Sequence, residues 1–315
     1  MQHKSGFFFA CASSFGFALV AWLVKSFNGG LPPATLLFYR SFFTALILLP
    51  FIWTELKKLK LRAYRLLLTR GFWGGAAILI YFFNIVELGP TLASNISSFS
   101  TVFSFLIGKL MNREHTTKPQ LVGIALCNIN IFLIATAFSE VSKSTLLLGL
   151  LGSFCAALSV NTARKSKNAN ISPNMIYFGF AIATIFAPIP FTKNLIVPKE
   201  LSSYIAILAM VAAAWLAQYT LVHAYATLGN AKASAIGRLV VVWAFALELV
   251  TRTGVYSNMK LLICGITVAG CALITLPKRE AQSAEAFSES MASKEEECAT
   301  ESTPTQLATY ERIRH

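Results

Sequence analysis

The sequence repeats itself after about 140 residues, a period far too long for the stacked units of a solenoid. Identical residues recur at this spacing without a gap, in apolar stretches and in loops alike. The matches include Pro33 with Pro173, Phe38 with Phe178, Thr44 with Thr184, Leu61 with Leu201, Tyr64 with Tyr204, Gly89 with Gly229, Ser94 with Ser234, Val102 with Val242 and Phe105 with Phe245. Because loops match as well, shared hydrophobicity does not explain the repeat. The pattern predicts one structural unit used twice.

Each copy of this unit is rich in membrane-spanning segments. Hydrophobic residues make up 55% of the 315 residues and charged residues only 13%, whereas soluble domains carry about 25% charged residues. Apolar runs of roughly 18 to 22 residues recur, each long enough to cross a bilayer as a helix. The expected spans are 6–25, 34–53, 67–87, 91–110, 119–138, 145–163, 173–191, 202–226, 231–251 and 258–276. The sequence therefore predicts an all-α integral membrane protein with ten transmembrane helices.

The two copies are predicted to be inverted repeats. Residues 1–138 and 139–279 each hold five expected spans, and an odd number forces the second copy to enter the membrane in the opposite orientation. Inverted repeats are a known way to build alternating access around a central site. Residues 280–315 differ: they are polar, rich in Ser, Thr and Glu, and predicted to form a disordered cytoplasmic tail. This organisation predicts a secondary transporter.

The net charge of +13 is unevenly distributed. Most basic residues flank spans on the side that the N-terminus would share, and the opposite loops carry few. The basic residues on that side are Lys57, Lys58, Lys60, Arg62, Arg65, Arg70, Lys109, Arg113, Lys118, Arg164, Lys165, Lys167, Lys278 and Arg279. By the positive-inside rule both termini are expected in the cytoplasm. The basic excess then faces anionic membrane lipid, and nucleic acid is not an expected partner.

Several enzyme classes are disfavoured by what the sequence lacks. There is no aspartate and no P-loop, so an aspartyl nucleophile and the usual phosphate cradle are both missing. The six cysteines are scattered and form no CxxC or Cys/His cluster. We expect no enzymatic activity, no catalytic residue, no metal site and no cofactor.

Two arginines lie about a third of the way into expected spans, Arg40 in the second and Arg238 in the ninth. A charge within a span costs about 2.5–3.5 kcal/mol on insertion scales, so such residues suggest function. Arginine binds a carboxylate or phosphate bidentately and stays charged. Snorkelling to a headgroup, or structural pairing with backbone carbonyls, would also explain them. Gly237 beside Arg238 would allow a ligand to approach closely.

Span eight carries a polar-aromatic stripe. Trp215, Tyr219 and His223 recur every four residues with Gln218 beside them, so they share one helical face. We expect this face to line a cavity, and hydrogen bonding between helices is the alternative. The further candidates for cavity residues are Tyr81, Asn84, Ser98 and Asn161.

Carboxylates are scarce outside the tail, and none lies clearly at mid-membrane. Glu248, in the outer part of span nine, is expected to pair with Arg252 one turn later. Ion-driven carriers usually keep a buried acid for the coupling ion. Exchange or facilitated transport is therefore favoured over strong ion coupling.

Over residues 6–278 the sequence resembles the EamA-like branch of the drug/metabolite transporter superfamily. The resemblance rests on five motifs. These are Phe38-Tyr39-Arg40, Leu49-Pro50-Phe51, Leu88-Gly89-Pro90-Thr91-Leu92-Ala93-Ser94, Arg113-Glu114 and Gln120-Leu121-Val122-Gly123. The family often has a proline in spans four and nine, where this sequence has Ser100-Thr101-Val102 and Leu239-Val240-Val241.

Within that branch, the paired arginines look most like those of S-adenosylmethionine carriers from obligate intracellular bacteria. This resemblance implies antiport in the bacterial inner membrane, with S-adenosylmethionine taken up in exchange for S-adenosylhomocysteine and Arg40 and Arg238 near the substrate. An exporter of amino acids or related metabolites would use the same arginines, so the sequence leaves both open. A membrane-embedded enzyme or a scaffold is a weaker alternative, because neither explains the buried arginines.

Overall fold

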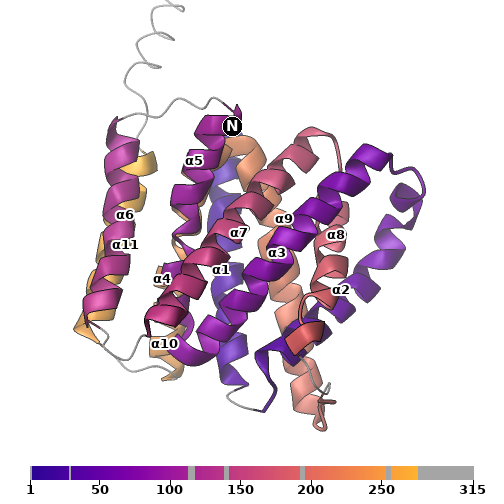
Figure 1. Cartoon of the computed structure of the whole chain (residues 1–315), viewed down its shortest axis with the longest axis horizontal. Helices are drawn as coiled ribbons and strands as arrows, with labels where there is room; N and C mark the ends of the chain where they lie inside the picture. The colour runs from indigo at the N-terminus through magenta and orange to yellow at the C-terminus, as the bar shows by residue number, and fades with distance from the viewer. Residues whose placement is uncertain are drawn as a thin grey trace, which may run out of the picture. The chain divides into compact units, whose positions relative to one another are not determined.

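The computed structural model describes residues 2–27, 30–112, 118–137, 142–191, 196–252 and 257–275, and every regular element among them is helical (Figure 1). The elements are α1 (Gln2–Ser26), α2 (Pro33–Leu56), α3 (Leu61–Leu88), α4 (Pro90–Ser97), α5 (Ser100–Asn112), α6 (Lys118–Ala137), α7 (Lys143–Asn168), α8 (Pro173–Phe186), the 3₁₀ turn η1 (Ile189–Phe191), α9 (Leu201–Gly237), α10 (Val240–Thr251) and α11 (Asn258–Thr275). The all-α membrane fold is confirmed.

Eight helical segments in the described part are long and apolar enough to cross a membrane. They are Ser5–Ser26, Pro33–Leu56, Leu61–Leu88, Lys143–Asn168, Pro173–Phe191, Leu201–Gly229, Lys232–Thr251 and Asn258–Thr275. The expected fourth and fifth spans are not among them. The fourth is divided between α4 and α5, and the apolar part of α6 is shorter, Leu121–Thr136. The count of ten therefore stays a prediction.

The sequence repeat is visible in the backbone. Gly89 (φ 83°, ψ 165°) and Gly229 (φ 77°, ψ 174°) adopt the same conformation, which essentially only glycine can hold. Each precedes a helical segment of eight residues, and each segment ends in a short turn before the next helix begins. Those turns start at Ser98 and Arg238, again 140 residues apart. Both copies thus contain a glycine turn, a short helix and a break.

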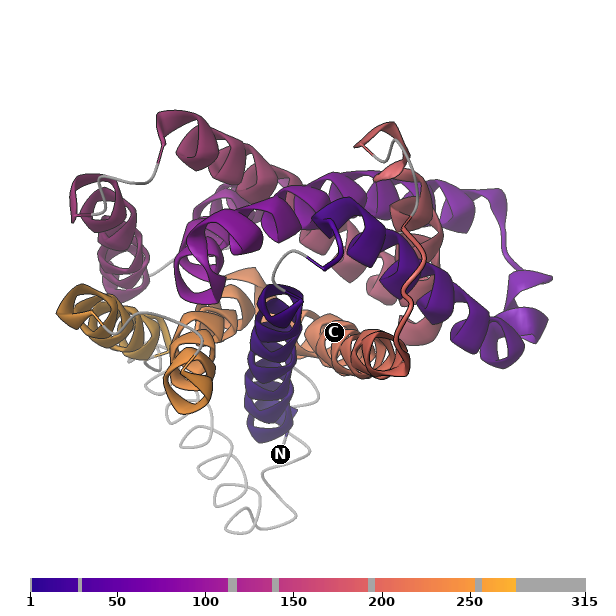
Figure 2. The same cartoon turned by 90° about the horizontal axis from the view of Figure 1, so that it is seen from below.

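Helix packing follows the same relation between the copies. At the 140-residue spacing, α1 corresponds to α7 and α3 corresponds to the first part of α9. The contact between α1 and α9 therefore has its counterpart in the contact between α7 and α3, and both are present. The pairs α2 with α8 and α6 with α11 convert into themselves, and the pair α4 with α10 converts into the end of α9 with α5. All of these pairs pack together (Figures 1 and 2). The contacts between helices thus follow the same 140-residue relation as the sequence.

The two predicted repeats, 1–138 and 139–279, do not form separate bodies. One compact unit extends to Thr275, because helices from one repeat pack mainly against helices from the other. The boundary between the repeats therefore stays a prediction from sequence. The predicted tail, 280–315, lies outside the described residues.

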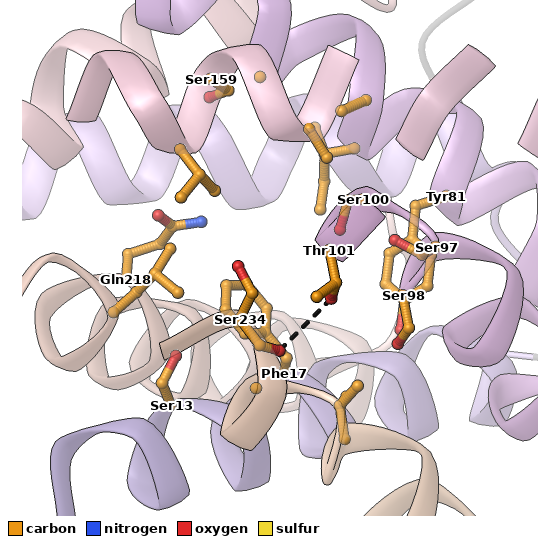
Figure 3. A pocket seen from close by; sticks show the side chains of 18 of the residues that line it. Ser13, Phe17, Tyr81, Ser97, Ser98, Ser100, Thr101, Ser159, Gln218 and Ser234 are labelled. Carbon is orange, nitrogen blue, oxygen red and sulfur yellow. Dashed lines mark hydrogen bonds between the residues drawn. The ribbon is translucent and has the colours of Figure 1, made fainter. Parts of the chain in front are cut away.

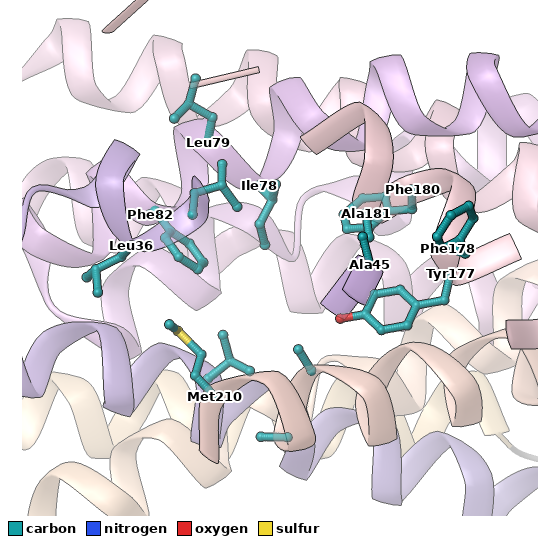
Figure 4. Packing of buried hydrophobic residues seen from close by; sticks show 14 of the residues in the cluster. Leu36, Ala45, Ile78, Leu79, Phe82, Tyr177, Phe178, Phe180, Ala181 and Met210 are labelled. Atoms are coloured by element: carbon teal, nitrogen blue, oxygen red, sulfur yellow. The ribbon is translucent and has the colours of Figure 1, made fainter. Parts of the chain in front are cut away.

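The largest buried cluster lies among α1, α2, α3, α8 and α9, with Phe82 close to Leu36 and Ile78 (Figure 4). Close approach of α3 to its neighbours depends on Gly74, because a side chain there would collide with the Phe180 ring and the Ser159 hydroxyl. This approach brings one face of α3 against both α7 and α8, where the cavity described next is found.

Candidate functional site

A cavity of about 170 Å³ opens between the two copies, lined from α1, α3, α4, α5, α7, α8, α9 and α10 (Figure 3). Among the described residues, 23 line the cavity; ten of these carry a hydroxyl group and none is acidic. The hydroxyl-bearing residues are Ser13, Tyr81, Ser94, Ser97, Ser98, Ser100, Thr101, Ser159, Tyr225 and Ser234. The charged side chains in the lining are two arginines, one from each copy. The cavity therefore has mainly apolar walls that carry hydroxyl groups and two positive charges.

The first of these arginines is Arg70 on α3. It is 1% exposed and lies over the Phe180 ring, 5.5 Å from its centroid. Its Nη1 donates to the Ser159 carbonyl (3.2 Å) and its Nη2 to Gln218 Oε1 (2.7 Å), while its Nε has no hydrogen-bond partner among the described residues. Both partners are neutral, so the positive charge of Arg70 is oriented but not cancelled.

Counting Arg70 among the cytoplasmic loop charges was wrong. α3 begins at Leu61, six residues before the expected span, so Arg70 lies three turns inside the helix. The spacing of Leu67, Arg70, Gly74 and Ile78 on one helical face was the sequence signal that could have placed it inside.

The second arginine, Arg238, lies at the break between α9 and α10 and is 3% exposed. Its Nε donates to Thr101 Oγ1 (3.0 Å) on α5, and its Nη2 donates to Asn128 Oδ1 (2.8 Å) on α6. Gly237 also lines the cavity, and a Cβ there would meet nothing within 4 Å. The missing side chain leaves open space at Gly237, the residue before Arg238.

Matching tyrosine–serine contacts hold the two short helices of the repeat. Tyr81 Oη lies 2.7 Å from Ser94 Oγ, and Tyr225 Oη lies 2.6 Å from Ser234 Oγ. The serines are equivalent in the repeat, whereas the tyrosines are not, because the residue equivalent to Tyr81 is Leu221. The same contact is thus made from a different turn of the preceding helix. All four residues line the cavity.

Four of the ten side chains proposed from sequence line this cavity, and six do not. Those in the lining are Tyr81, Ser98, Gln218 and Arg238. Those elsewhere are Arg40, Asn84, Asn161, Trp215, Tyr219 and His223. Asn84 is buried against Gly149 of α7, and Asn161 donates to the Ala157 carbonyl of its own helix.

The aromatic row of span eight packs on itself. Tyr219 lies between Trp215 and His223, with ring centroids 5.5 and 4.9 Å apart, and His223 also stacks on Phe9 of α1 at 5.2 Å. Trp215 Nε1 donates to Asn174 Oδ1 at 3.2 Å. Residues four apart on a helix stack along its axis, and this row faces away from the cavity that Gln218 enters.

The expected pairing of Glu248 with Arg252 is also wrong. α10 ends at Thr251, and Arg252 turns into the left-handed region (φ 55°). Glu248 is 3% exposed and pairs with Lys260 of α11 at 2.9 Å. Its other carboxylate oxygen accepts from the Thr91 backbone N–H at 3.0 Å, at the start of α4.

Arg40 stands apart from the other buried arginines. It is 2% exposed, and its Nε and Nη1 have no hydrogen-bond partner among the described residues. The Phe82 ring lies beside its guanidinium, with the centroid 5.8 Å away. Leaving a buried charge without its partner typically costs about 3–5 kcal/mol.

Comparison with known proteins agrees with this architecture. Residues 4–136 match the EamA-like transporter family. The first copy of the repeat thus matches the EamA-like transporter family. The whole chain is 26% identical over 223 residues to the pseudopaline exporter CntI of Pseudomonas aeruginosa, covering 70% of this chain and 78% of that protein. An uncharacterized transporter of Helicobacter pylori is also 26% identical, over 66% of this chain and 74% of its own.

A solved structure supports the fold independently. A crystal structure superposes with a TM-score of 0.64 over 85% of this chain and 98% of its own, at 17% sequence identity. An identity this low supports the fold alone. Together with the family, the relatives and the apolar helices, it makes the protein a multi-pass membrane transporter.

Proposed function

We propose that this membrane transporter carries a small, carboxylate-bearing metabolite by alternating access and binds its carboxylate between Arg70 and Arg238. The observation that carries the proposal is a cavity with one guanidinium from each copy and no acidic side chain among the described residues that line it. An arginine–carboxylate contact is a charge-assisted hydrogen bond, about twice as strong as a neutral one. A substrate without an anionic group would leave both guanidinium groups without a counter-charge.

The hydroxyl groups complete the site for an anion. A carboxylate has two oxygens and about four acceptor sites, so it takes more donors than one guanidinium supplies. Thr101 lies beside Arg238, Gln218 supplies an amide beside Arg70, and the Ser98 and Ser234 hydroxyl groups lie in the same cavity wall. Phe17 and Phe180 offer apolar faces for the rest of the substrate. Such a mix of apolar walls and a few polar groups is typical of metabolite sites.

The repeated glycine turns supply the moving parts. Gly89 and Gly229 each precede a short helix that reaches the cavity, so a rotation at either glycine would move one wall. Hinges are usually a few residues at element ends that absorb a change in φ and ψ. Opening at one turn while the other stays closed would expose the cavity to each side of the membrane in succession.

Two specific substrates fit this class. Export of amino acids or related metabolites is the candidate that we favour, because the cavity of about 170 Å³ is small beside the ~300–1,000 Å³ of typical ligand pockets. The relative named as a pseudopaline exporter is in line with export. Exchange of S-adenosylmethionine for S-adenosylhomocysteine is the second candidate. Phe17 and Phe180 could stack on its purine or sulfonium, although an adenosyl group requires the cavity to widen.

Transport into proteoliposomes tests the proposal. Vesicles are preloaded with unlabelled S-adenosylhomocysteine, amino acids or small dicarboxylates, and uptake of the matching labelled substrate is measured. We expect carboxylate-dependent counterflow that falls about 10- to 100-fold in Arg70→Gln and Arg238→Gln, the loss expected for one charged hydrogen bond. Arg65→Gln is the matched control, because Arg65 is exposed on the same helix as Arg70.

The substrates separate by competition. Adenosyl compounds should compete only if S-adenosylmethionine is carried, and uptake without any preload would argue against obligatory exchange. Wild-type counterflow that both arginine variants retain in full would overturn the assignment of the site.

We further propose a bacterial inner-membrane location with both termini in the cytoplasm, from the distribution of basic residues. Reporter tags at either end should then be inaccessible in intact spheroplasts and accessible after lysis. Labelling of either terminal tag in intact spheroplasts would contradict this topology.

A further inference from the structure

Two of the three nitrogens of the Arg40 guanidinium, Nε and Nη1, have no hydrogen-bond acceptor among the described residues. Arg70 and Arg238, which are equally buried, each donate at least two hydrogen bonds to side chains or backbone. Arg40 is 2% exposed, its Nε and Nη1 donate to no described group, and an aromatic face, that of Phe82, lies 5.8 Å from it. Buried donors normally find acceptors, and each exception calls for an explanation such as an ion that belongs there.

The helices around Arg40 do not supply the missing anion. α2 packs against α3, α8 and α9, and α8 and α9 contain no acidic residue. Glu55 lies fifteen residues further along α2, about 22 Å by helical rise, and it accepts from Ser172. Glu87 on α3 is exposed and accepts from Thr145 of α7. The two carboxylates on these helices are thus engaged elsewhere.

Arg40 is also separate from the cavity. Phe82, its ring partner, lies twelve residues beyond Arg70 on α3, which is about 18 Å along the helix. Tyr81 and Ile78 line the cavity, whereas Phe82 belongs to the buried cluster beside it (Figure 4). Arg40 therefore lies next to the cavity wall, towards the end of α3 that leads into Gly89.

We propose that Arg40 forms a second anion-binding site, distinct from the cavity, which takes the carboxylate or phosphate group of one ligand. The planar fork of arginine matches both groups bidentately. The Phe82 face supports the guanidinium from one side and leaves its edge for the anion. The oxyanion has two possible sources, a soluble anion that passes this point or the phosphate of a lipid headgroup. The geometry around Arg40 carries this proposal, whatever the cavity transports.

Thermal unfolding of the full chain in lipid nanodiscs tests this site independently of transport. The parent protein carries Arg70→Gln and Arg238→Gln, so that the cavity charges are absent. In phosphatidylcholine discs, inorganic phosphate or citrate is titrated at constant ionic strength. If a soluble anion occupies the site, the midpoint temperature of unfolding should rise as the anion is added. Arg40→Gln should then raise the anion concentration that gives half of this rise about tenfold or more.

A second set of discs distinguishes the lipid source. If a headgroup phosphate occupies the site, adding phosphatidylglycerol to the discs should raise the midpoint temperature of unfolding. Soluble anions should then have no further effect, and Arg40→Gln should abolish the rise caused by the lipid. In either case the Arg40→Lys protein should be stabilised only weakly by the anion or the lipid, because lysine keeps the positive charge but cannot bind an oxyanion bidentately. The exposed-site control Arg65→Gln should behave as the parent does.

Two results would overturn the site. One is a parent protein that responds to neither soluble anion nor anionic lipid. The other is an Arg40→Gln protein whose response equals that of the parent in both sets of discs. Should Arg40→Gln fail to fold, Arg40→Lys in the parent protein carries the comparison, and a response equal to that of the parent counts against the site.

Discussion

The two glycine turns have the same backbone and opposite electrostatic surroundings. At Gly89, Glu248 Oε1 lies 3.4 Å from the place a Cβ would occupy, and the same oxygen accepts from the Thr91 N–H. At Gly229, the nearest group to that place is Arg164 Nη2, at 3.9 Å. A carboxylate thus lies at one turn and a guanidinium at the other.

This difference has a physical consequence. The start of a helix carries a partial positive charge, so a carboxylate stabilises it. Glu248 therefore holds the first turn of α4 in place, and Lys260 completes a buried ion pair. A guanidinium at the equivalent point gives no such stabilisation. The repeat conserves the geometry of both turns, while the side chains make the Gly89 turn the more firmly held of the two.

Removing the Glu248 carboxylate should have the largest effect on the difference between the Gly89 and Gly229 turns. Glu248→Gln leaves Lys260 buried without its counter-charge and weakens the cap on α4, so we expect a loss of about 3–5 kcal/mol in unfolding free energy. Chemical or thermal unfolding of the reconstituted protein measures it. The control is Glu200→Gln, because Glu200 is exposed before α9.

A double variant separates the buried charge from the cap. Glu248→Gln with Lys260→Met should recover part of the lost stability, because neither charge is then left unpaired. If the single variant is as stable as the wild type, Glu248 does not hold the Gly89 turn and the two turns are equivalent.

Sequence reasoning succeeded where a pattern repeats. The apolar runs gave the helices, and the 140-residue spacing of Gly89 and Gly229 anticipated two turns of identical backbone. It missed the breaks at Ser98 and Arg238, because neither has the proline that would mark a break. Hydropathy cannot show a break of two residues inside an apolar run.

The site was harder to predict than the fold. Arg238 and Gln218 were placed in the cavity by their position inside apolar spans. Arg70 was missed because it follows a cluster of loop charges, and only the register of α3 against α7 and α8 turns it inward. Conversely, the row from Trp215 to His223 has a helical period but faces away from the cavity. Periodicity identifies a face of a helix, and tertiary packing decides what that face contacts.

Alanine at either glycine should have the next largest effect. A Cβ is strained at a φ near 80° with ψ near 170°, so Gly89→Ala and Gly229→Ala should each cost about 1–3 kcal/mol. We expect similar losses of stability, because the backbone is the same. Counterflow measured in both vesicle orientations should fall in both variants. A large loss from one glycine alone would show that the other turn relaxes, which would break the symmetry of the proposed hinges.

The smallest effects should come from the tyrosine–serine contacts. Tyr81→Phe and Tyr225→Phe each remove one hydrogen bond to equivalent serines, so each should cost about 1 kcal/mol. Similar losses would show that the short helices are held alike, and that the asymmetry resides at the glycine turns. If Tyr81→Phe lowers the free energy of unfolding much more than Tyr225→Phe does, contacts in the middle of α4 also stabilise it, in addition to Glu248 at its start. The free energy of unfolding of each variant measures this difference. Tyr64→Phe is the control, because Tyr64 is exposed on α3 and the substitution removes a hydroxyl remote from the cavity.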